Sequence, residues 1–258
     1  MRLSALYRYP LKSARGETLQ QIGLDKLGLQ GDRRWMLVDE ASGRFLTQRA
    51  VARMSQLSAL WNDQGGLTLS APGHSTLEVA LPGADAPLRG VTIWQDTLRV
   101  PDAGDEAAAW VSEFIGKPSR LVQVPAQRAR STAAGYGRDD DQVAFADGFP
   151  LLLIGQASLD DLVARVGRPL EMLRFRPNLV VEGSAALPRT TGSACVSAMS
   201  SSVWSSHARA AFSPPSIRRP ASAVPTANLW PPCRSTGPRP MGRCSARTWS
   251  MMATVACR

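Results

Sequence analysis

The amino-acid sequence changes character after Ala186, and this break limits what the chain can fold into. From Leu187 to the C-terminus there are nine arginines but no lysine, aspartate or glutamate. The first 186 residues contain 21 basic and 21 acidic residues, so the entire net charge of +9 lies in the last 72. All four cysteines lie there too, namely Cys195, Cys233, Cys244 and Cys257. We therefore expect a folded body over 1–186 and an aberrant basic tail over 187–258.

Two explanations of the tail remain open. Its composition and its lack of a sustained hydrophobic period are typical of a disordered basic segment. Translation of GC-rich DNA in the wrong frame would produce the same residues and would also remove aspartate, glutamate and lysine together. With suitable codons, Cys195–Ser202 regroups by one base into Arg-Ile-Gly-Asp-Val-Glu-Phe, a strand-like segment. The frameshift is thus a hypothesis that the coding DNA can test.

The body of the chain shows many short strand patterns and only two helical ones. The helices are predicted from Asp105 to Ile115, with Asp105 as the cap, and from Ser158, with Asp161 in an imperfect capping box, to Gly167. The predicted strands cover 3–9, 19–24, 35–39, 44–47, 56–61, 67–71, 76–80, 90–100, 120–124, 149–154 and 179–181. Strands at this spacing indicate a mixed, β-rich (α+β) fold of barrel or sandwich type, rather than βαβ units.

Composition and missing motifs exclude several functional classes. The chain has no apolar run of about 18 residues that could span a bilayer, and its start lacks a signal-peptide core, so we expect no membrane partner. A cysteine-free body is consistent with the cytoplasm. The electrically neutral body argues against a specific nucleic-acid partner, although the arginine tail leaves salt-dependent DNA binding as an alternative. Outside the tail the only histidine is His74, so a histidine metal site or a Ser-His-Asp triad is nearly excluded.

Three groups of residues could carry chemistry. Lys12 and Ser13 follow the first strand, and Arg33 follows a glycine-rich turn, so two cations and a hydroxyl could bind a phosphate. Pro177 should keep Arg176 extended, which would place Arg176 and Asn178 on the same side to bind an anion and a heterocycle edge.

The third candidate is Ser158, whose helix N-terminus could attract an anion. The competing structural readings are solvated loop cations for the first group, a charged surface strand for the second, and a plain N-cap for Ser158. Asp139–Asp141 could bind a cation, although a solvated acidic loop explains it better.

Six segments combine charged or polar residues with strand-like or helix-start patterns, and they are Tyr9–Ser13, Gly31–Asp39, Phe45–Arg49, Asp147–Leu152, Ala157–Leu159 and Arg174–Asn178. In this order they resemble the MOSC family of molybdenum-cofactor proteins. The resemblance implies an N-terminal β-barrel domain over 1–120 and a partial MOSC domain over 121–186. It also implies a molybdopterin-type molybdenum cofactor, with Lys12, Ser13 and Arg33 at its phosphate end and Ser158, Arg176 and Asn178 around the pterin. The family is further associated with molybdenum-ion and pyridoxal-phosphate binding.

Similarity to the amidoxime-reducing members implies an oxidoreductase that reduces small N-hydroxylated compounds. Because the sequence has no cysteine-rich iron–sulfur segment, electrons would come from a separate flavin or iron–sulfur protein. A molybdenum-cofactor or sulfur carrier without turnover of its own is the alternative.

The chain departs from the family pattern after Asn178. Family members continue with an acidic, tryptophan-containing segment, a further strand and a cysteine whose thiolate binds molybdenum, and none of these stands here. We therefore predict no catalytic and no metal-binding residue, and weak or absent molybdenum retention. Without the last strands, Leu179–Val181 should also lack a strand partner.

Overall fold

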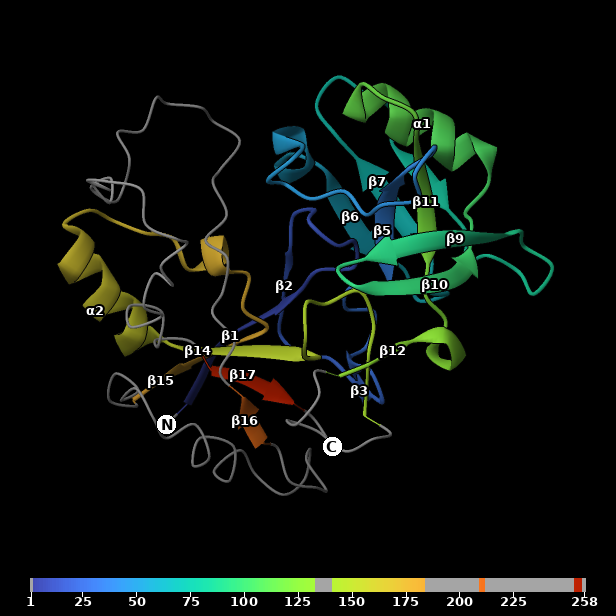
Figure 1. Ribbon diagram of the computed structural model, residues 1–258. Coiled ribbons are helices and arrows are strands. Elements are labelled where there is room, and N and C mark those ends of the chain that lie inside the picture. The colour runs from blue at the N-terminus through green and yellow to red at the C-terminus, as the bar shows by residue number, and fades with distance from the viewer. Residues whose placement is uncertain (1, 133–140, 184–208, 212–252, 257–258) are drawn as a thin grey trace, which may run out of the picture.

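The computed structural model describes residues 2–132 and 141–183, together with the backbone of 209–211 and 253–256. Figure 1 shows its elements. The longer helices are α1 (Asp105–Ile115) and α2 (Gln156–Val166), and the short 3-10 helices are η1 (Ala52–Ser55), η2 (Ala126–Arg128) and η3 (Met172–Phe175). The strands are β1 (Arg2–Arg8), β2 (Glu17–Leu19), β3 (Leu24–Asp25), β4 (Gly28–Leu29), β5 (Trp35–Asp39), β6 (Ser58–Trp61), β7 (Leu67–Ser70), β8 (Leu77–Val79), β9 (Leu88–Ile93), β10 (Asp96–Pro101), β11 (Ser119–Gln123), β12 (Arg130–Ser131), β13 (Gln142–Val143), β14 (Leu151–Gly155), β15 (Leu179–Glu182), β16 (Arg209–Ala211) and β17 (Ala253–Ala256). The predicted β-rich α+β class is confirmed.

The largest sheet joins the two ends of the described chain. Its strand order is β16-β17-β14-β15-β1-β2, with β14 and β15 parallel and the other pairs antiparallel. Strand β15 lies between β14 and β1, with Leu3 opposite Val181 and Leu6 opposite Leu179. The prediction that Leu179–Val181 lacks a partner is therefore wrong, because the first strand of the chain fills the place that we assigned to missing later strands.

The N-terminal part is built from small antiparallel sheets covered at one end by α1 (Figure 1). Strand β5 pairs with β11, β6 and β8 flank β7, and β9 pairs with β10. Four residues on one face of α1, at positions i, i+3, i+4 and i+7, are buried, and they are Ala107, Trp110, Val111 and Phe114. They pack against a core that includes Trp35, Leu37 and Leu121. Each fully buried side chain of this size contributes roughly 1.5–3 kcal/mol, so α1 is held mainly by its apolar face.

The predicted strands and helices agree with the structure except at particular turns. Residues 90–100 form a hairpin rather than one strand, because the chain reverses at Trp94 and Gln95. The predicted strand 19–24 is also wrong, since β2 ends at Leu19 and β3 starts at Leu24. Residues 44–47 meet β5 only through the single bridge from Phe45 to Val38, and the full partner of β5 is β11.

Both helix caps differ from prediction. Gly104 and Gly155 are the N-caps, neither helix has a side-chain cap, and α2 begins two residues before Ser158. Both helices end at glycines in the left-handed region, Gly116 and Gly167, and the predicted end at Gly167 is confirmed. The tail is predicted to be disordered, but two of its segments form the strands β16 and β17.

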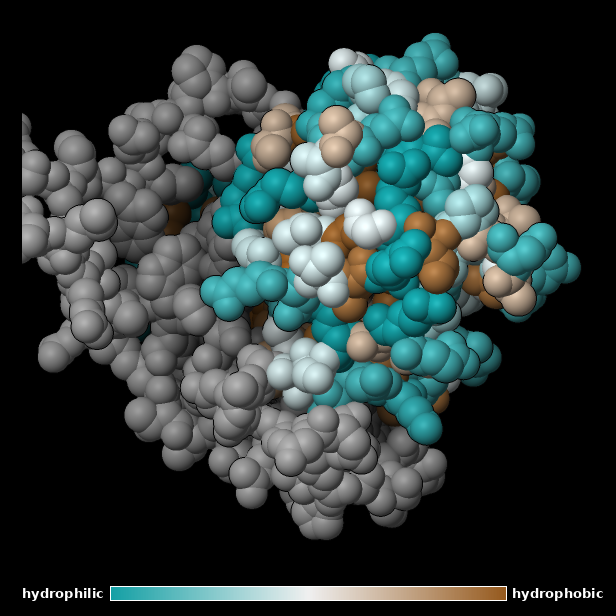
Figure 2. All heavy atoms as spheres, turned by 45° about the vertical axis from the view of Figure 1, so that its right-hand side comes forward, coloured by the Kyte–Doolittle hydropathy of each residue, from teal (hydrophilic) through white to brown (hydrophobic). Residues whose placement is uncertain are grey.

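The surface of the described part is mixed in character. The face in Figure 2 is mostly hydrophilic, with small hydrophobic areas separated by polar side chains. In the described ranges, no helix combines the length and the apolar character that crossing a bilayer requires.

Candidate functional site

Three segments far apart in the sequence meet where β1 ends. They are the loop 9–13 after β1, the turn 31–34 before β5, and residues 176–178 before β15. The antiparallel pairing of β1 with β15 brings the first and third together, and a bridge from Leu11 to Trp35 adds the second. We call Tyr9, Lys12, Arg33, Arg176 and Asn178 the arginine–tyrosine cluster.

Asn178 joins the segments of this cluster. Its side-chain oxygen accepts hydrogen bonds from Arg33 Nη1 at 2.7 Å and from the Leu152 backbone N–H at 3.1 Å. Its amide nitrogen donates to the Tyr7 carbonyl at 3.2 Å. With an exposure of 1%, the side chain connects β1, β14 and β15 as well as Arg33. Asn178 therefore orients the arginine rather than facing solvent.

Two guanidinium groups lie against one tyrosine ring. The Arg176 Cζ is 4.1 Å and the Arg33 Cζ is 4.5 Å from the centroid of Tyr9. Arg33 also donates to Asp32 Oδ2 at 2.5 Å and to the Arg176 carbonyl at 3.0 Å, and Arg176 donates to the Ala14 carbonyl. The arrangement concentrates hydrogen-bond donors and positive charge in a site of low exposure.

Tyr9 is the residue of this cluster that sequence reasoning missed. It is 1% exposed, and its hydroxyl has no hydrogen-bond partner among the described residues. Burial raises the pKa of Tyr9 to about 12, although the charges of Arg176 and Arg33 oppose this rise. Gly16 permits the packing, because a Cβ there would lie 2.3 Å from Tyr9 Cε1. A buried hydroxyl without a partner costs about 1–3 kcal/mol, so a donor is held here at the expense of stability.

Lys12, three residues after Tyr9, lies near two aromatic rings. Its Nζ donates to the Phe145 carbonyl and to Asp147 Oδ1, both at 2.7 Å. The same atom is 5.6 Å from the ring centroid of Phe45 and 5.7 Å from that of Trp94. The competing reading of Lys12 as a solvated loop cation is wrong, because Lys12 is only 3% exposed.

Backbone strain is concentrated at the same place. In the described part of the chain, the non-glycine residues with positive φ are Ser13 (68°), Arg33 (48°), Trp94 (54°) and Arg176 (56°). Three of them are predicted cofactor residues, and the fourth contacts Lys12. Left-handed backbone at such residues costs of order 1–3 kcal/mol each and collects at functional sites. Positive φ at three predicted cofactor residues supports a ligand-binding role for this site. The burial of Lys12 and Arg33 alone would not indicate such a role.

The predicted geometry of two residues needs correction. Arg176 is not extended, because it ends η3 in the left-handed region, yet its guanidinium still reaches the ring of Tyr9. Ser158 is buried in the first turn of α2, as the third helical residue rather than the cap. Its role toward a ligand stays a prediction, as does the role of Ser13, which is fully buried beside Lys12.

The chemistry of the cluster fits the non-metal part of a molybdopterin-type group. A phosphate or a pterin edge needs several hydrogen-bond donors, and two guanidinium groups pack against the ring of Tyr9, whose hydroxyl has no partner among the described residues. The metal part has less support, since no group of three histidine, cysteine or acidic side chains is placed for a metal within the described residues. The four cysteines lie outside those residues, and so do Asp139 and Asp140 of the acidic run.

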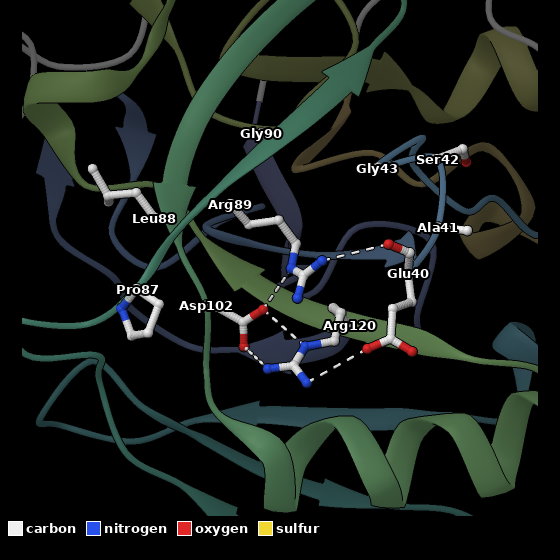
Figure 3. Close-up of a pocket in the computed structure, with 10 residues that line it drawn as sticks. All are labelled: Glu40, Ala41, Ser42, Gly43, Pro87, Leu88, Arg89, Gly90, Asp102 and Arg120. Atoms are coloured by element: carbon white, nitrogen blue, oxygen red, sulfur yellow. Dashed lines mark hydrogen bonds and ion pairs between the residues drawn. The ribbon is translucent and has the colours of Figure 1, made fainter.

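A second group of charges surrounds a cavity of about 440 Å³ near the other end of β5 (Figure 3). Asp102, with 3% of its side chain exposed, accepts hydrogen bonds from Arg120 at 2.6 and 2.9 Å and from Arg89 at 2.8 Å. Burial alone would raise the pKa of Asp102, but the hydrogen bonds from Arg120 and Arg89 outweigh it and lower the pKa. Arg120 also contacts Asp105 and Glu40, so each guanidinium group faces at least one carboxylate and the contacts connect β11 with α1.

Comparison with known proteins supports the order of the motifs. The model of the MOSC N-terminal beta barrel domain matches residues 1–118, and that of the MOSC domain matches residues 140–201. The mitochondrial amidoxime-reducing component 1 of Mus musculus is 34% identical over 190 residues, covering 70% of this chain and 55% of that protein. The mitochondrial amidoxime reducing component 2 of Bos taurus is 32% identical over 200 residues, covering 73% and 58%.

A molybdenum cofactor sulfurase of Oryza sativa subsp. japonica is 30% identical over 201 residues, covering 71% of this chain and 24% of that protein. The chain spans a little over half the length of the two amidoxime-reducing relatives. Both family domains follow one another here as the sequence motifs indicated, and together they account for most of residues 1–201. The chain belongs to the MOSC family and combines the N-terminal β-barrel domain with a MOSC domain.

Proposed function

We propose that the arginine–tyrosine cluster binds a molybdopterin-type molybdenum cofactor, in a chain derived from oxidoreductases that reduce N-hydroxylated compounds. The observation that carries the proposal is the packing of Arg33 and Arg176 against the ring of Tyr9, a buried residue whose hydroxyl has no partner among the described residues. Relatives whose names specify amidoxime reduction and molybdenum-cofactor sulfuration support the cofactor.

The residues would divide the cofactor between them. Lys12, Ser13 and Arg33 would hold its phosphate end, where charge-assisted hydrogen bonds contribute roughly 1.5–3 kcal/mol each. Arg176, Asn178 and Ser158 would hold the pterin, with Asn178 keeping Arg33 in place. When bound, the cofactor supplies two-electron redox chemistry.

In the overall reaction, an N-hydroxylated compound takes up two electrons and two protons to give the amine or amidine and water. The electrons would come from a separate flavin or iron–sulfur protein. We keep the cytoplasm as the proposed compartment on the basis of the cysteine-free body. Pyridoxal-phosphate binding stays a prediction of the resemblance.

We also propose that this chain binds molybdenum more weakly than it binds the pterin part of the cofactor. Because no cysteine stands before Cys195, the described part offers no thiolate, and the retained molybdenum should be well below one ion per bound pterin. The experiment loads the full chain with molybdenum cofactor, removes the excess, and measures pterin by fluorescence and molybdenum by mass spectrometry. Retained pterin with little molybdenum supports the proposal. Absence of pterin would refute cofactor binding, and stoichiometric molybdenum would refute the weaker binding of the metal.

A carrier or sulfur-handling module without turnover is the second candidate. The cysteine-free body and the similarity to a sulfurase favour it. Resequencing the DNA from the codon of Glu182 to that of Ser202 decides whether a frame-corrected chain exists. If the corrected chain reduces an N-hydroxylated compound, the oxidoreductase proposal stands. If the corrected chain binds the cofactor without turnover, the carrier is the better assignment.

A further inference from the structure

The tip of the β9–β10 hairpin carries a tryptophan where the backbone favours glycine. Ile93 pairs with Asp96, so Trp94 and Gln95 form a two-residue turn. Trp94 has a φ of +54°, and Gln95 is not among the residues with positive φ. A positive φ at the first central position alone is the pattern of a type II′ turn, in which glycine is preferred there. Trp94 is therefore retained at a conformational cost.

Packing does not explain this tryptophan. Its exposure is 40%, although its ring lies 4.9 Å from the ring of Phe45 at an angle of 59°. A side chain that served the core would be covered, and a turn that served only the hairpin would use a smaller residue.

The hairpin holds the ring at the rim of the arginine–tyrosine cluster. Asp96, two residues after Trp94, forms an ion pair with Arg130 at 2.8 Å. Arg130 also donates to the carbonyls of Ala144 and Ala146, in the loop whose Phe145 carbonyl accepts from Lys12. In Figure 1 the arrowhead of β9 accordingly points toward the loop that precedes β14. The position of Trp94 is thus fixed relative to Lys12.

A cation stands beside the ring. Arg49 is exposed, and its Cζ is 5.6 Å from the Trp94 centroid. Within the described ranges Arg49 forms no ion pair, unlike Arg33, Arg89 and Arg120, so its donors are available to a ligand. A partly exposed indole next to such a guanidinium suits a flat conjugated ring that carries an acidic group.

We propose that Trp94, Phe45 and Arg49 form a stacking site for the planar part of the small-molecule substrate, with Arg49 binding an acidic substituent on it. The proposal rests on the proposed function only for the identity of the substrate as an N-hydroxylated compound. It predicts a preference for aromatic over aliphatic compounds and, among the aromatic ones, for those with a carboxylate.

The test measures binding rather than turnover, using the full chain and three probes. These are benzamidoxime, its 4-carboxy derivative, and acetamidoxime as the aliphatic comparison, each titrated by calorimetry. Trp94→Gly should weaken both aromatic probes about three- to tenfold, the range expected for one lost aromatic contact, and leave acetamidoxime unchanged. Trp94→Phe should retain most of the affinity. Arg49→Gln should weaken only the carboxylated probe.

Arg53→Gln is the matched control, because Arg53 is an exposed arginine 5.1 Å from a different ring, that of Phe114. It should bind all three probes normally. The thermal midpoint of Trp94→Gly should be unchanged or higher, since glycine relieves the positive φ. No detectable binding of benzamidoxime to the unaltered chain, or equal affinities of the unaltered and Trp94→Gly chains, would overturn the stacking site.

The two proposals can fail separately. If the chain retains no pterin but binds aromatic probes in a Trp94-dependent way, the stacking site stands and the cofactor assignment fails. If pterin is retained while Trp94→Gly changes no affinity, the cofactor assignment stands and the stacking site fails.

Discussion

The charged group around Asp102 and the arginine–tyrosine cluster differ in how fully their charges and hydrogen-bond donors are paired. Around Asp102, two arginines donate to one carboxylate, Arg120 adds contacts to Asp105 and Glu40, and no residue of the group has a positive φ. In the arginine–tyrosine cluster, cations gather around a tyrosine whose hydroxyl has no described partner, and two of the five residues are in the left-handed region. The first group is complete by itself, whereas the second gains from an added ligand.

This difference distinguishes charged side chains that stabilise the fold from charged side chains that bind a ligand. Complete ion-pair networks connect elements, as Asp102 connects β9 and β11 through Arg89 and Arg120 (Figure 3). A binding site instead keeps strain and unsatisfied donors that a ligand can relieve. Substitutions in the first group should therefore affect folding, and those in the second should affect binding more than folding.

The largest expected effect is on stability at Asp102. Asp102→Asn leaves two partly buried arginines without their shared carboxylate and should destabilise the fold by about 3 kcal/mol, the lower end for a broken buried pair. Because the folded pKa is lowered, this stabilisation is present above pH ~4 and lost as the pH falls further. Urea unfolding at pH 7 and at pH 3 measures both effects. Asp85→Asn, in an exposed loop, is the control, and equal losses in the two variants would contradict a structural role.

Arg176→Gln should, in contrast to Asp102→Asn, weaken cofactor binding more than it destabilises the fold. Losing a guanidinium that contacts both Tyr9 and the Ala14 carbonyl should lower cofactor affinity at least tenfold, because charge-assisted hydrogen bonds are lost. The free energy of unfolding should change by less than it does in Asp102→Asn. Pterin retention and urea unfolding of the same preparations check the two parts. A variant that loses stability but keeps its pterin would refute the distinction between the two groups.

Tyr9→Phe tests the orphaned hydroxyl. Removing a buried group without a partner should stabilise the unliganded chain by about 1 kcal/mol while weakening cofactor binding. The folded pKa of about 12 exceeds the ordinary value of about 10, so the natural chain loses stability as the pH rises from 10 to 12. Thermal unfolding between pH 9 and 12 should show this loss in the natural chain and a smaller one in the variant. Identical alkaline profiles would mean that Tyr9 is not the group that titrates.

Ser13→Gly should have the smallest effect. Glycine adopts the φ of +68° without strain, so the fold should gain up to about 1 kcal/mol, offset by the loss of the hydroxyl contacts. The measured quantity is the thermal midpoint with and without cofactor. A ligand-induced rise that shrinks in the variant supports Ser13 as a phosphate contact, whereas an unchanged rise removes it from the site.

Local secondary structure and the order of the family motifs could be predicted from the sequence. Helix α1 has the bounds Asp105–Ile115 that residues able to start and stop a helix predict, and β5 follows from a run of apolar residues. The hairpin of β9 and β10 was missed because Trp94 and Gln95 carry no turn signal, although an unusual turn residue is what a functional constraint produces.

The long-range parts of the site could not be predicted by periodicity. The pairing of β1 with β15 and the contact of Lys12 with Asp147 join residues more than a hundred positions apart. The resemblance supplied Arg33, Arg176 and Asn178 together, and the structure shows all three in contact. Tyr9 gave no signal of its own except that it precedes Pro10 and Lys12 at the end of a strand.

The position of β1 between β15 and β2 has a consequence for biosynthesis. Arg2–Arg8 leaves the ribosome before its neighbour Leu179–Glu182, which emerges about 10–35 seconds later at ordinary elongation rates. During that interval one edge of the nascent strand pairs with β2 and the other stays open. A slow codon before residue 179 would prolong this exposure, and a fusion partner ahead of Met1 would lie beside the open edge. Soluble yield should therefore depend more on an N-terminal fusion than on a C-terminal one.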